Sequence, residues 1–383
     1  MNLLYDLSLL GFCGNDPSKI TGMPRVILEQ GTRLQTVPDC AVTFCATEDP
    51  ADTYPVVRLH PAFRDARLVP WSAEEPALTL PPDVLAGADV FHNPHSAIPD
   101  EVRRFPGVAA IQTVYDMIPF LLPETLTQNY RDYYGDIVAH ILPTDHVITI
   151  SQSAKDDFCG YTRFDAARVH VVPLAANPQL FYPCHDAERQ AAVRRKYAIP
   201  DGPYLLSVCT FEPRKNLRHV IRSFVALLEA QPELTDLTLV LAGGRGWMFD
   251  EILAELAGTA ALRSRIVTTG YVDDADLAPL YTGTLGFLYL SRYEGFGLPP
   301  LEAMQCGTPT VTANTSSLPE VVGNAGFLLP PDDQDLLCQT MLDFVRRPGM
   351  RPELAERSLR RAAGFSWERN IAQTMDVYRL ACG

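Results

Sequence analysis

The amino-acid sequence predicts an α/β protein with two doubly wound parallel sheets, one in each of two domains. The chain has 383 residues, which is long for a single compact core and suits two domains of ordinary size. Short apolar runs alternate with helical runs, an order that is typical of parallel sheets covered on both faces. A proline-rich stretch without a clear strand, residues 173–190, separates the two series. We therefore expect two domains that face each other across a cleft.

Runs of β-branched and apolar residues give the predicted strands in chain order. In the first half these are residues 2–7, 42–47, 88–93, 108–116, 146–151 and 168–173. In the second half they are residues 204–210, 237–244, 265–270, 284–291 and 308–313. Helical periodicity is clear in residues 216–230 and 333–347. The predicted domains are residues 1–175 and 185–365.

Composition narrows the class of protein. The net charge of −14 argues against nucleic-acid binding, which normally needs a basic face. The nine cysteines are scattered without a Cys-x-x-Cys pair, which favours free thiols and neither disulfides nor structural zinc. The first residues lack the basic start of a signal peptide, and no apolar run approaches the length of a membrane span. We expect a cytoplasmic protein.

The stretch from Ser291 to Pro309 predicts a binding loop followed by a short helix. It follows a buried strand, and ligands of doubly wound sheets lie at the carboxyl ends of strands. Gly295 and Gly297 allow a close backbone approach, and a helix of roughly residues 298–306 would present its positive end there. This combination indicates a phosphate-binding loop.

Two glutamates, Glu294 and Glu302, flank that loop. Carboxylates make poor phosphate ligands but good acceptors for hydroxyl groups. A nucleotide-sugar carries hydroxyls on both sides of its diphosphate, so we expect Glu294 at the sugar and Glu302 at the ribose. The alternative is that Glu302 only complements the helix dipole and Glu294 is a solvated loop residue.

A second loop, after the strand at 204–210, carries Arg214 and Lys215. Arginine can bind a diphosphate with its planar fork and lysine as a point charge. The alternative is a pair of surface charges in a turn.

Taken together, these segments resemble glycosyltransferase family 4. The resemblance is carried by YEGFGLPPLEAMQCGTP at 293–309, TFEPRKN at 210–216, GYVDDADLAPLY at 270–281 and SSLPEVVGNAG at 316–326. Weaker matches in the first half are TGMPRV, FHNPHSAIP, TVYDMIPFLLPE and VITISQSAKDDF. The family implies retaining enzymes with the GT-B fold, which is two Rossmann-like domains with a terminal helix that returns to the first. By this resemblance, residues 366–383 are the terminal helix and complete the domain of residues 1–175.

The resemblance also implies roles for residues. The implied catalytic set is Glu294, Lys215, Arg214 and Asp116. The implied donor-binding set is Gly22, Thr210, Arg214, Lys215, Tyr271, Val272, Glu294, Gly295, Phe296, Gly297, Leu298 and Glu302.

The chain departs from the family pattern at three places. Cys209-Thr210 stands where many members have Gly-Arg, and the first loop keeps only Gly22 of the usual glycine pair. Tyr115 stands where many members have histidine, so its hydroxyl could keep that hydrogen bond or mark a changed acceptor pocket. We place Tyr115 and His92 on the acceptor side, with a satisfied loop histidine as the alternative for His92.

Two acidic patterns are assigned to helix starts. Asp274-x-Asp276 resembles a metal-binding motif of another transferase fold, but we expect it to cap a helix. Ser317 and Glu320 have capping-box spacing. We therefore expect no metal site.

The sequence thus predicts a metal-independent retaining hexosyltransferase without a cofactor. GDP-mannose is the first expectation for the donor, with UDP-glucose and dTDP-rhamnose open. The acceptor is expected to be a glycan or lipid-linked saccharide, with peripheral association at the cytoplasmic face of a membrane as a further expectation. The alternatives are a nucleotide-sugar epimerase of the same fold and a non-catalytic nucleotide-sugar-binding subunit.

Overall fold

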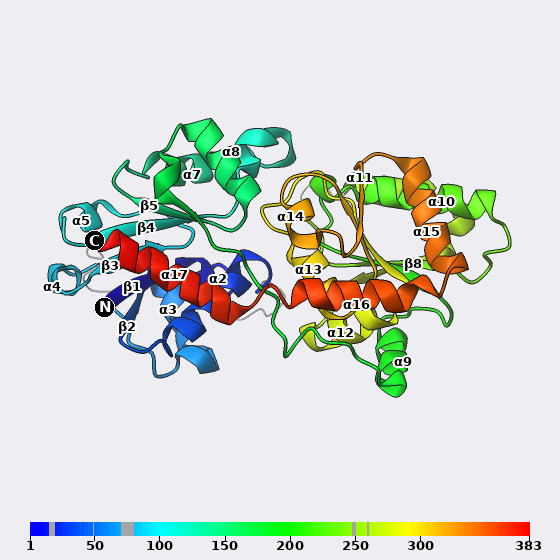
Figure 1. Cartoon of the computed structure of the whole chain (residues 1–383), viewed down its shortest axis with the longest axis horizontal. Coiled ribbons are helices and arrows are strands. Elements are labelled where there is room, and N and C mark those ends of the chain that lie inside the picture. The colour runs from blue at the N-terminus through cyan, green and yellow to red at the C-terminus, as the bar shows by residue number, and fades with distance from the viewer. Residues whose placement is uncertain (15–19, 49, 70–79, 247–249, 259) are drawn as a thin grey trace. The chain divides into compact units, whose positions relative to one another are not determined.

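The structure is a computed structural model that describes residues 1–14, 20–48, 50–69, 80–246, 250–258 and 260–383. The chain forms two compact units (Figure 1). Unit 1 comprises Met1–Pro123, Thr127–Leu174 and Trp367–Gly383, and unit 2 comprises Glu124–Leu126 and Ala175–Ser366.

The sheet of unit 1 has six parallel strands in the order β2-β1-β3-β4-β5-β6. They are β1 Asn2–Asp6, β2 Ala41–Cys45, β3 Val90–Asn93, β4 Ala109–Val114, β5 His146–Thr149 and β6 Val169–Val171. The helices of this unit are α1 Ser8–Gly11, α2 Met23–Leu34, α3 Pro50–Leu59, α4 Pro82–Ala86, α5 Asp100–Arg103, α6 Ile118–Leu121, α7 Gln128–Ala139, α8 Gln152–Thr162 and α17 Trp367–Ala381.

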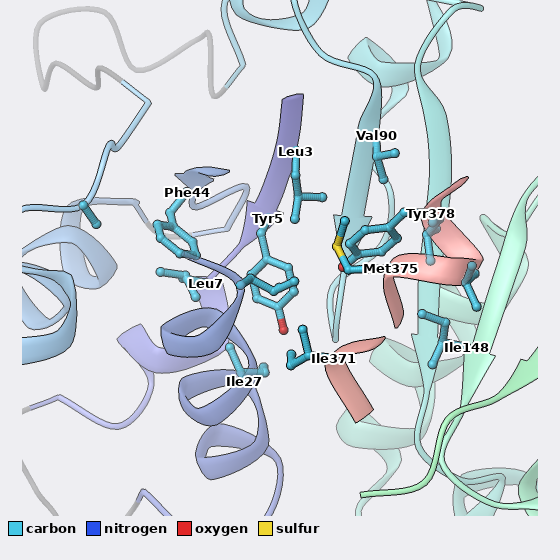
Figure 2. Close-up of a cluster of buried hydrophobic side chains, with 14 of the residues drawn as sticks. Leu3, Tyr5, Leu7, Ile27, Phe44, Val90, Ile148, Ile371, Met375 and Tyr378 are labelled. Atoms are coloured by element: carbon cyan, nitrogen blue, oxygen red, sulfur yellow. The ribbon is translucent and has the colours of Figure 1, made fainter. Parts of the chain in front are cut away.

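The terminal helix α17 is an integral part of unit 1, because its apolar face completes the core. Ile371, Met375 and Tyr378 pack with Leu3 and Tyr5 of β1 (Figure 2). Burial of such side chains stabilises a fold by roughly 1.5–3 kcal/mol each, so removal of this helix would open the core.

The sheet of unit 2 also has six parallel strands, in the order β12-β11-β10-β7-β8-β9. They are β7 Tyr204–Val208, β8 Thr238–Ala242, β9 Ile266–Gly270, β10 Gly286–Tyr289, β11 Thr310–Ala313 and β12 Phe327–Leu329. The helices are α9 Ala187–Lys196, α10 Leu217–Ala230, α11 Asp250–Gly258, α12 Asp274–Gly283, α13 Leu298–Gln305, α14 Leu318–Val322, α15 Gln334–Arg346 and α16 Met350–Ala362. Two doubly wound parallel sheets were predicted, and this is confirmed.

The prediction of a capping box at Ser317 is wrong. Ser317 has helical backbone angles, φ −77° and ψ −11°, and its side chain makes no cap hydrogen bond. Its hydroxyl lies instead 2.8 Å from the carbonyl oxygen of Glu294 and 2.7 Å from that of Phe296. The spacing of Ser317 and Glu320 predicts a contact within one helical turn. The partners of the Ser317 hydroxyl lie instead in a loop more than twenty residues earlier in the chain.

Asp274 and Asp276 lie in the first turn of α12, as predicted. The N-cap residue, however, is Asp273, which makes no side-chain cap hydrogen bond. Asp273 and Asp276 instead accept hydrogen bonds from Lys196, at 2.7 and 2.6 Å. The described helices include none that is long and apolar enough to cross a membrane.

Candidate functional site

The predicted donor residues of unit 2 gather where the strand order reverses. β7 lies beside β10, yet the chain runs from β7 outward to β8 and β9 before it returns to β10. Such a switch point leaves room for a ligand at the carboxyl ends of the two strands. Arg214 and Lys215 belong to the 3₁₀ turn η5 Pro213–Lys215 after β7, and Glu294 follows β10. The N–H of Arg292 donates to the carbonyl of Arg214 at 2.9 Å and so ties the two loops together.

The carboxylate of Glu294 is the centre of this cluster. Its Oε1 accepts hydrogen bonds from Lys215 Nζ at 2.7 Å and from the Tyr289 hydroxyl at 2.9 Å. Arg214 Nη1 lies 3.0 Å from the same oxygen. The prediction placed Glu294 and these cations at different parts of the donor, whereas the structure brings them into direct contact.

The environment of Glu294 keeps its carboxylate ionised. The residue is 8% exposed, and burial alone would raise the pKa of its carboxyl. The charges of Arg214 and Lys215 outweigh that effect, together with hydrogen bonds from Lys215 and Ser291, and lower the pKa to about 2. Glu294 is therefore a buried, charged acceptor. The alternative of a solvated loop residue is wrong.

Arg214 is engaged with three groups of the protein. Its guanidinium donates to the carbonyl oxygen of Tyr293 at 2.6 Å, pairs with the carboxylate of Glu212, and contacts Glu294. The side chains of Arg214 and Lys215 are 12% and 11% exposed, so the alternative of two surface charges in a turn is also wrong.

Three consecutive hydroxyl residues after β11 hold the backbone around Glu294. Thr315 Oγ1 donates to the carbonyl of Ser291 at 3.2 Å, and Ser316 Oγ accepts the N–H of Glu294 at 2.8 Å. Ser317 lies within reach of the Glu294 and Phe296 carbonyls and is fully buried. The sequence analysis missed this support, as it missed Glu212 and Tyr289. A run of hydroxyl residues directly after a strand was the available signal.

The loop Gly295–Gly297 leads into α13 as predicted from its glycines and prolines. Gly297 has φ +113° and is the N-cap, and a Cβ there would lie 2.9 Å from Leu318 Cδ2. Two prolines follow Leu298, so the first turn of α13 keeps few N–H groups. Phe296 is buried and packs edge-on against Phe365, with ring centroids 5.8 Å apart.

Four further residues of the predicted donor-binding set fall in unit 2. Glu302 lies within α13, is 7% exposed and accepts a hydrogen bond from the Tyr281 hydroxyl at 3.2 Å. Tyr271 and Val272 follow β9 at its carboxyl end, and Thr210 is exposed after β7. The loops after β7, β9 and β10 therefore lie at the same edge of the sheet, because the strands are parallel.

The other predicted residues belong to unit 1. Gly22 has φ +57° and is the N-cap of α2. Asp116 Oδ1 accepts the N–H of Ile118 at 2.9 Å at the start of α6. Tyr115 is buried beside His95, with ring centroids 6.3 Å apart, and its hydroxyl has no hydrogen-bond partner among the described residues.

His92 is a satisfied histidine, as the alternative predicted, but it is not in a loop. It lies inside β3 and is 0% exposed. Its Nδ1 is 2.6 Å from the Tyr378 hydroxyl and its Nε2 is 2.8 Å from Thr113 Oγ1. Burial lowers the pKa of His92 to about 3, so the ring is neutral. Both ring nitrogens of His92 are hydrogen-bonded inside the core, so the ring has no nitrogen left to bind an acceptor.

Among the described residues there is no group of three or more His, Cys, Asp or Glu side chains that could hold a metal ion. The ion-paired cluster at Arg214 consists of two cations, Arg214 and Lys215, and two carboxylates, Glu212 and Glu294. This set suits an anionic ligand that also carries hydroxyl groups.

Comparisons with known proteins identify the relatives of this chain. Residues 189–361, which contain the whole Glu294 cluster, match the family model of the glycosyl transferases group 1. The O-antigen chain mannosyltransferase B of Escherichia coli is 34% identical over 292 residues, covering 76% of this chain and 74% of that protein. The serotype-specific mannosyltransferase WbdA of Escherichia coli is 32% identical over 255 residues, which are 66% of this chain but only 31% of that longer protein.

The fold has counterparts among solved structures. HepE of Anabaena, solved in complex with UDP-glucose, superposes with a TM-score of 0.71 over 99% of both chains at 14% identity. Two six-stranded parallel sheets with flanking helices are the GT-B arrangement of such glycosyltransferase structures. With a relative that is one-third identical over three-quarters of its length, the chain belongs to the glycosyl transferases group 1.

Proposed function

We propose that the protein is a retaining, metal-independent hexosyltransferase that uses a nucleoside-diphosphate sugar. The observation that carries this proposal is the contact of Glu294 with Lys215 and Arg214 at the switch point of β7 and β10. Two cations suit a diphosphate, and an ionised carboxylate beside them suits the hydroxyls of the attached sugar.

The chemistry follows from where charge develops. As the bond between the sugar C1 and the phosphate oxygen breaks, negative charge grows on the leaving diphosphate. By this proposal, Lys215, Arg214 and the N-terminal end of α13 stabilise that charge without a metal ion. The acceptor oxygen forms the new bond to C1 on the same face, and its proton passes to the departing phosphate oxygen. This step needs no further base from the protein.

The proposed donor is GDP-mannose and the proposed acceptor a hydroxyl of a glycan or lipid-linked saccharide. Two relatives named as mannosyltransferases, one of them acting in the O-antigen chain, support this choice. Neither the base nor the sugar is fixed by the Glu294 cluster itself, since any nucleoside-diphosphate hexose has a diphosphate and hydroxyls.

A thermal-shift panel tests the proposal. GDP, UDP, dTDP and their sugars are added singly to the purified chain. A true ligand at about 100 times its dissociation constant stabilises the folded state by roughly 2.7 kcal/mol. We expect GDP-mannose to give the largest shift. A panel in which no nucleotide or nucleotide-sugar shifts the transition would contradict the proposal.

A further inference from the structure

The two cations proposed to hold the diphosphate are already paired with carboxylates of the protein. Lys215 donates to Glu294 at 2.7 Å, and Arg214 is paired with Glu294 and with Glu212. All four side chains are only 10–12% exposed, so water screens these charges weakly.

The four charges of this cluster cancel. Arg214 and Lys215 contribute two positive charges, and Glu212 and Glu294 contribute two negative charges. A diphosphate that approaches the free protein therefore meets a neutral cluster rather than a doubly cationic one. Its attraction to the cations depends on what happens to the Glu294 carboxylate.

Glu294 is the carboxylate that a bound sugar can draw away from the cations. A buried carboxylate that loses its hydrogen-bond donors is costly, so Glu294 needs replacement donors before it releases Lys215 and Tyr289. The hydroxyls of the donor's hexose supply such donors. A nucleoside diphosphate lacks the hexose and supplies none at that position. Glu212 pairs with Nη2 of Arg214, whereas Glu294 contacts Nη1 of the same guanidinium.

We propose that Glu294 is a specificity-determining residue. Its carboxylate neutralises Lys215 and Arg214 in the free protein. It releases them to bind the diphosphate only when the donor's hexose binds the carboxylate. This inference rests on the proposed function. The site then binds the intact donor more tightly than the nucleoside-diphosphate product. Only the donor has a hexose whose hydroxyls replace the hydrogen bonds that Glu294 loses when it releases the two cations.

Calorimetric titration of Glu294→Gln tests this inference. Pyrophosphate, GDP and GDP-mannose are titrated separately into the wild-type chain and the variant. The amide keeps the shape of the side chain but removes the negative charge. We expect pyrophosphate and GDP to bind at least about tenfold more tightly to the variant, because the cations are no longer neutralised. The ratio of GDP-mannose to GDP affinity should shrink by a similar factor.

Glu212→Gln is the matched control. It removes the same charge from the same arginine, but by this account it does not touch the sugar. The control should leave the ratio of GDP-mannose to GDP affinity at the wild-type value. If Glu294→Gln does not fold, Glu294→Ala replaces it, since it also lacks the carboxylate.

The possible outcomes separate this inference from the proposed function. If GDP binds the wild-type chain but pyrophosphate and GDP bind Glu294→Gln no more tightly, the inference is overturned and the donor proposal survives. If GDP, UDP and pyrophosphate bind neither the wild-type chain nor any variant, the proposed function is overturned as well.

Discussion

The ammonium nitrogen of Lys215 lies 2.7 Å from Oε1 of Glu294, although the two residues are 79 positions apart in the chain. The contact joins the loop after β7 to the loop after β10. It places one cation and one carboxylate at the point where the sheet of unit 2 reverses its strand order. The predictions below follow from the proposed roles of these two loops.

Lys215→Ala should reduce donor turnover on the order of 100-fold, because it removes a cation that stabilises charge on the leaving diphosphate. Steady-state kinetics with GDP-mannose measure this loss. Arg346→Ala is the control, since it breaks an exposed ion pair with Glu233 and should leave turnover unchanged. If Lys215→Ala keeps the wild-type kcat/KM, the diphosphate is bound elsewhere.

Glu302→Ala and Glu294→Ala should affect different kinetic constants. The ribose does not change during the reaction, so loss of Glu302 should chiefly raise the donor KM and weaken GDP binding. The sugar gains positive character as its bond to phosphate breaks, so loss of Glu294 should chiefly lower kcat without weakening GDP binding. Hydrogen bonds to a charged group contribute roughly 1.5–3 kcal/mol, which corresponds to about 10- to 150-fold. The reverse pattern, with GDP binding lost in Glu294→Ala alone, would reverse the assignment of the two glutamates.

Ser317→Ala should lower kcat about tenfold with little change in donor KM. The hydroxyl of Ser317 is a positioning group that bonds the backbone of the Glu294 loop, and its loss costs roughly 1–3 kcal/mol of local stability. Ser358→Ala is the matched control. The Ser358 hydroxyl is also fully buried and donates a hydrogen bond to the carbonyl oxygen of Thr308 at 3.2 Å. The control should lose similar stability but retain kcat. Equal loss of kcat in both variants would mean that Ser317 acts only through general stability.

The stability of the wild-type chain should depend on pH through Glu294. Burial alone would raise the pKa of its carboxyl, but the two cations lower it from 4.5 to about 2. The pKa of this carboxyl is lower in the folded state than in the unfolded state. The group therefore stabilises the fold at pH values above its unfolded-state pKa. This stabilisation is lost as the pH falls through the folded-state pKa. The contribution is about 3 kcal/mol above pH ~5.

Urea denaturation midpoints between pH 6 and pH 3 measure this dependence. Wild-type stability should fall more steeply with decreasing pH than that of Glu294→Gln, which cannot titrate at this position. Parallel profiles for the two proteins would show that the Glu294 carboxyl is not held ionised by its neighbours.

The sheets could be predicted from sequence because apolar runs and turn residues are local signals. Strand β12, Phe327–Leu329, was not predicted because it contains no β-branched residue, whereas the equally short β6 lies in the β-branched run 168–173. The position of Glu294 after a strand was also predictable from its neighbours. Its contact with Lys215 was not, because the order of strands in a sheet brings distant loops together and no local pattern records it.

The errors have a similar cause. Ser317 and Glu320 have the spacing of a capping box, but burial directs the Ser317 hydroxyl to the Glu294 loop. His92 lies in the strand predicted over residues 88–93, but its ring bonds to Tyr378 and Thr113 in the core, and no local pattern shows these partners. In both cases a tertiary partner decided the role of a polar side chain whose sequence context indicated another.

The most direct test of the central claim is proton NMR of the product formed from GDP-α-mannose in buffer that contains EDTA. Oligosaccharides ending in mannose, glucose, galactose or N-acetylglucosamine serve as acceptors. The account predicts transfer to an acceptor, with the new anomeric signal in the α configuration of the donor and with no need for added metal. A β-linked product, transfer only after Mg²⁺ or Mn²⁺ is supplied, or an epimerised donor without transfer would contradict it.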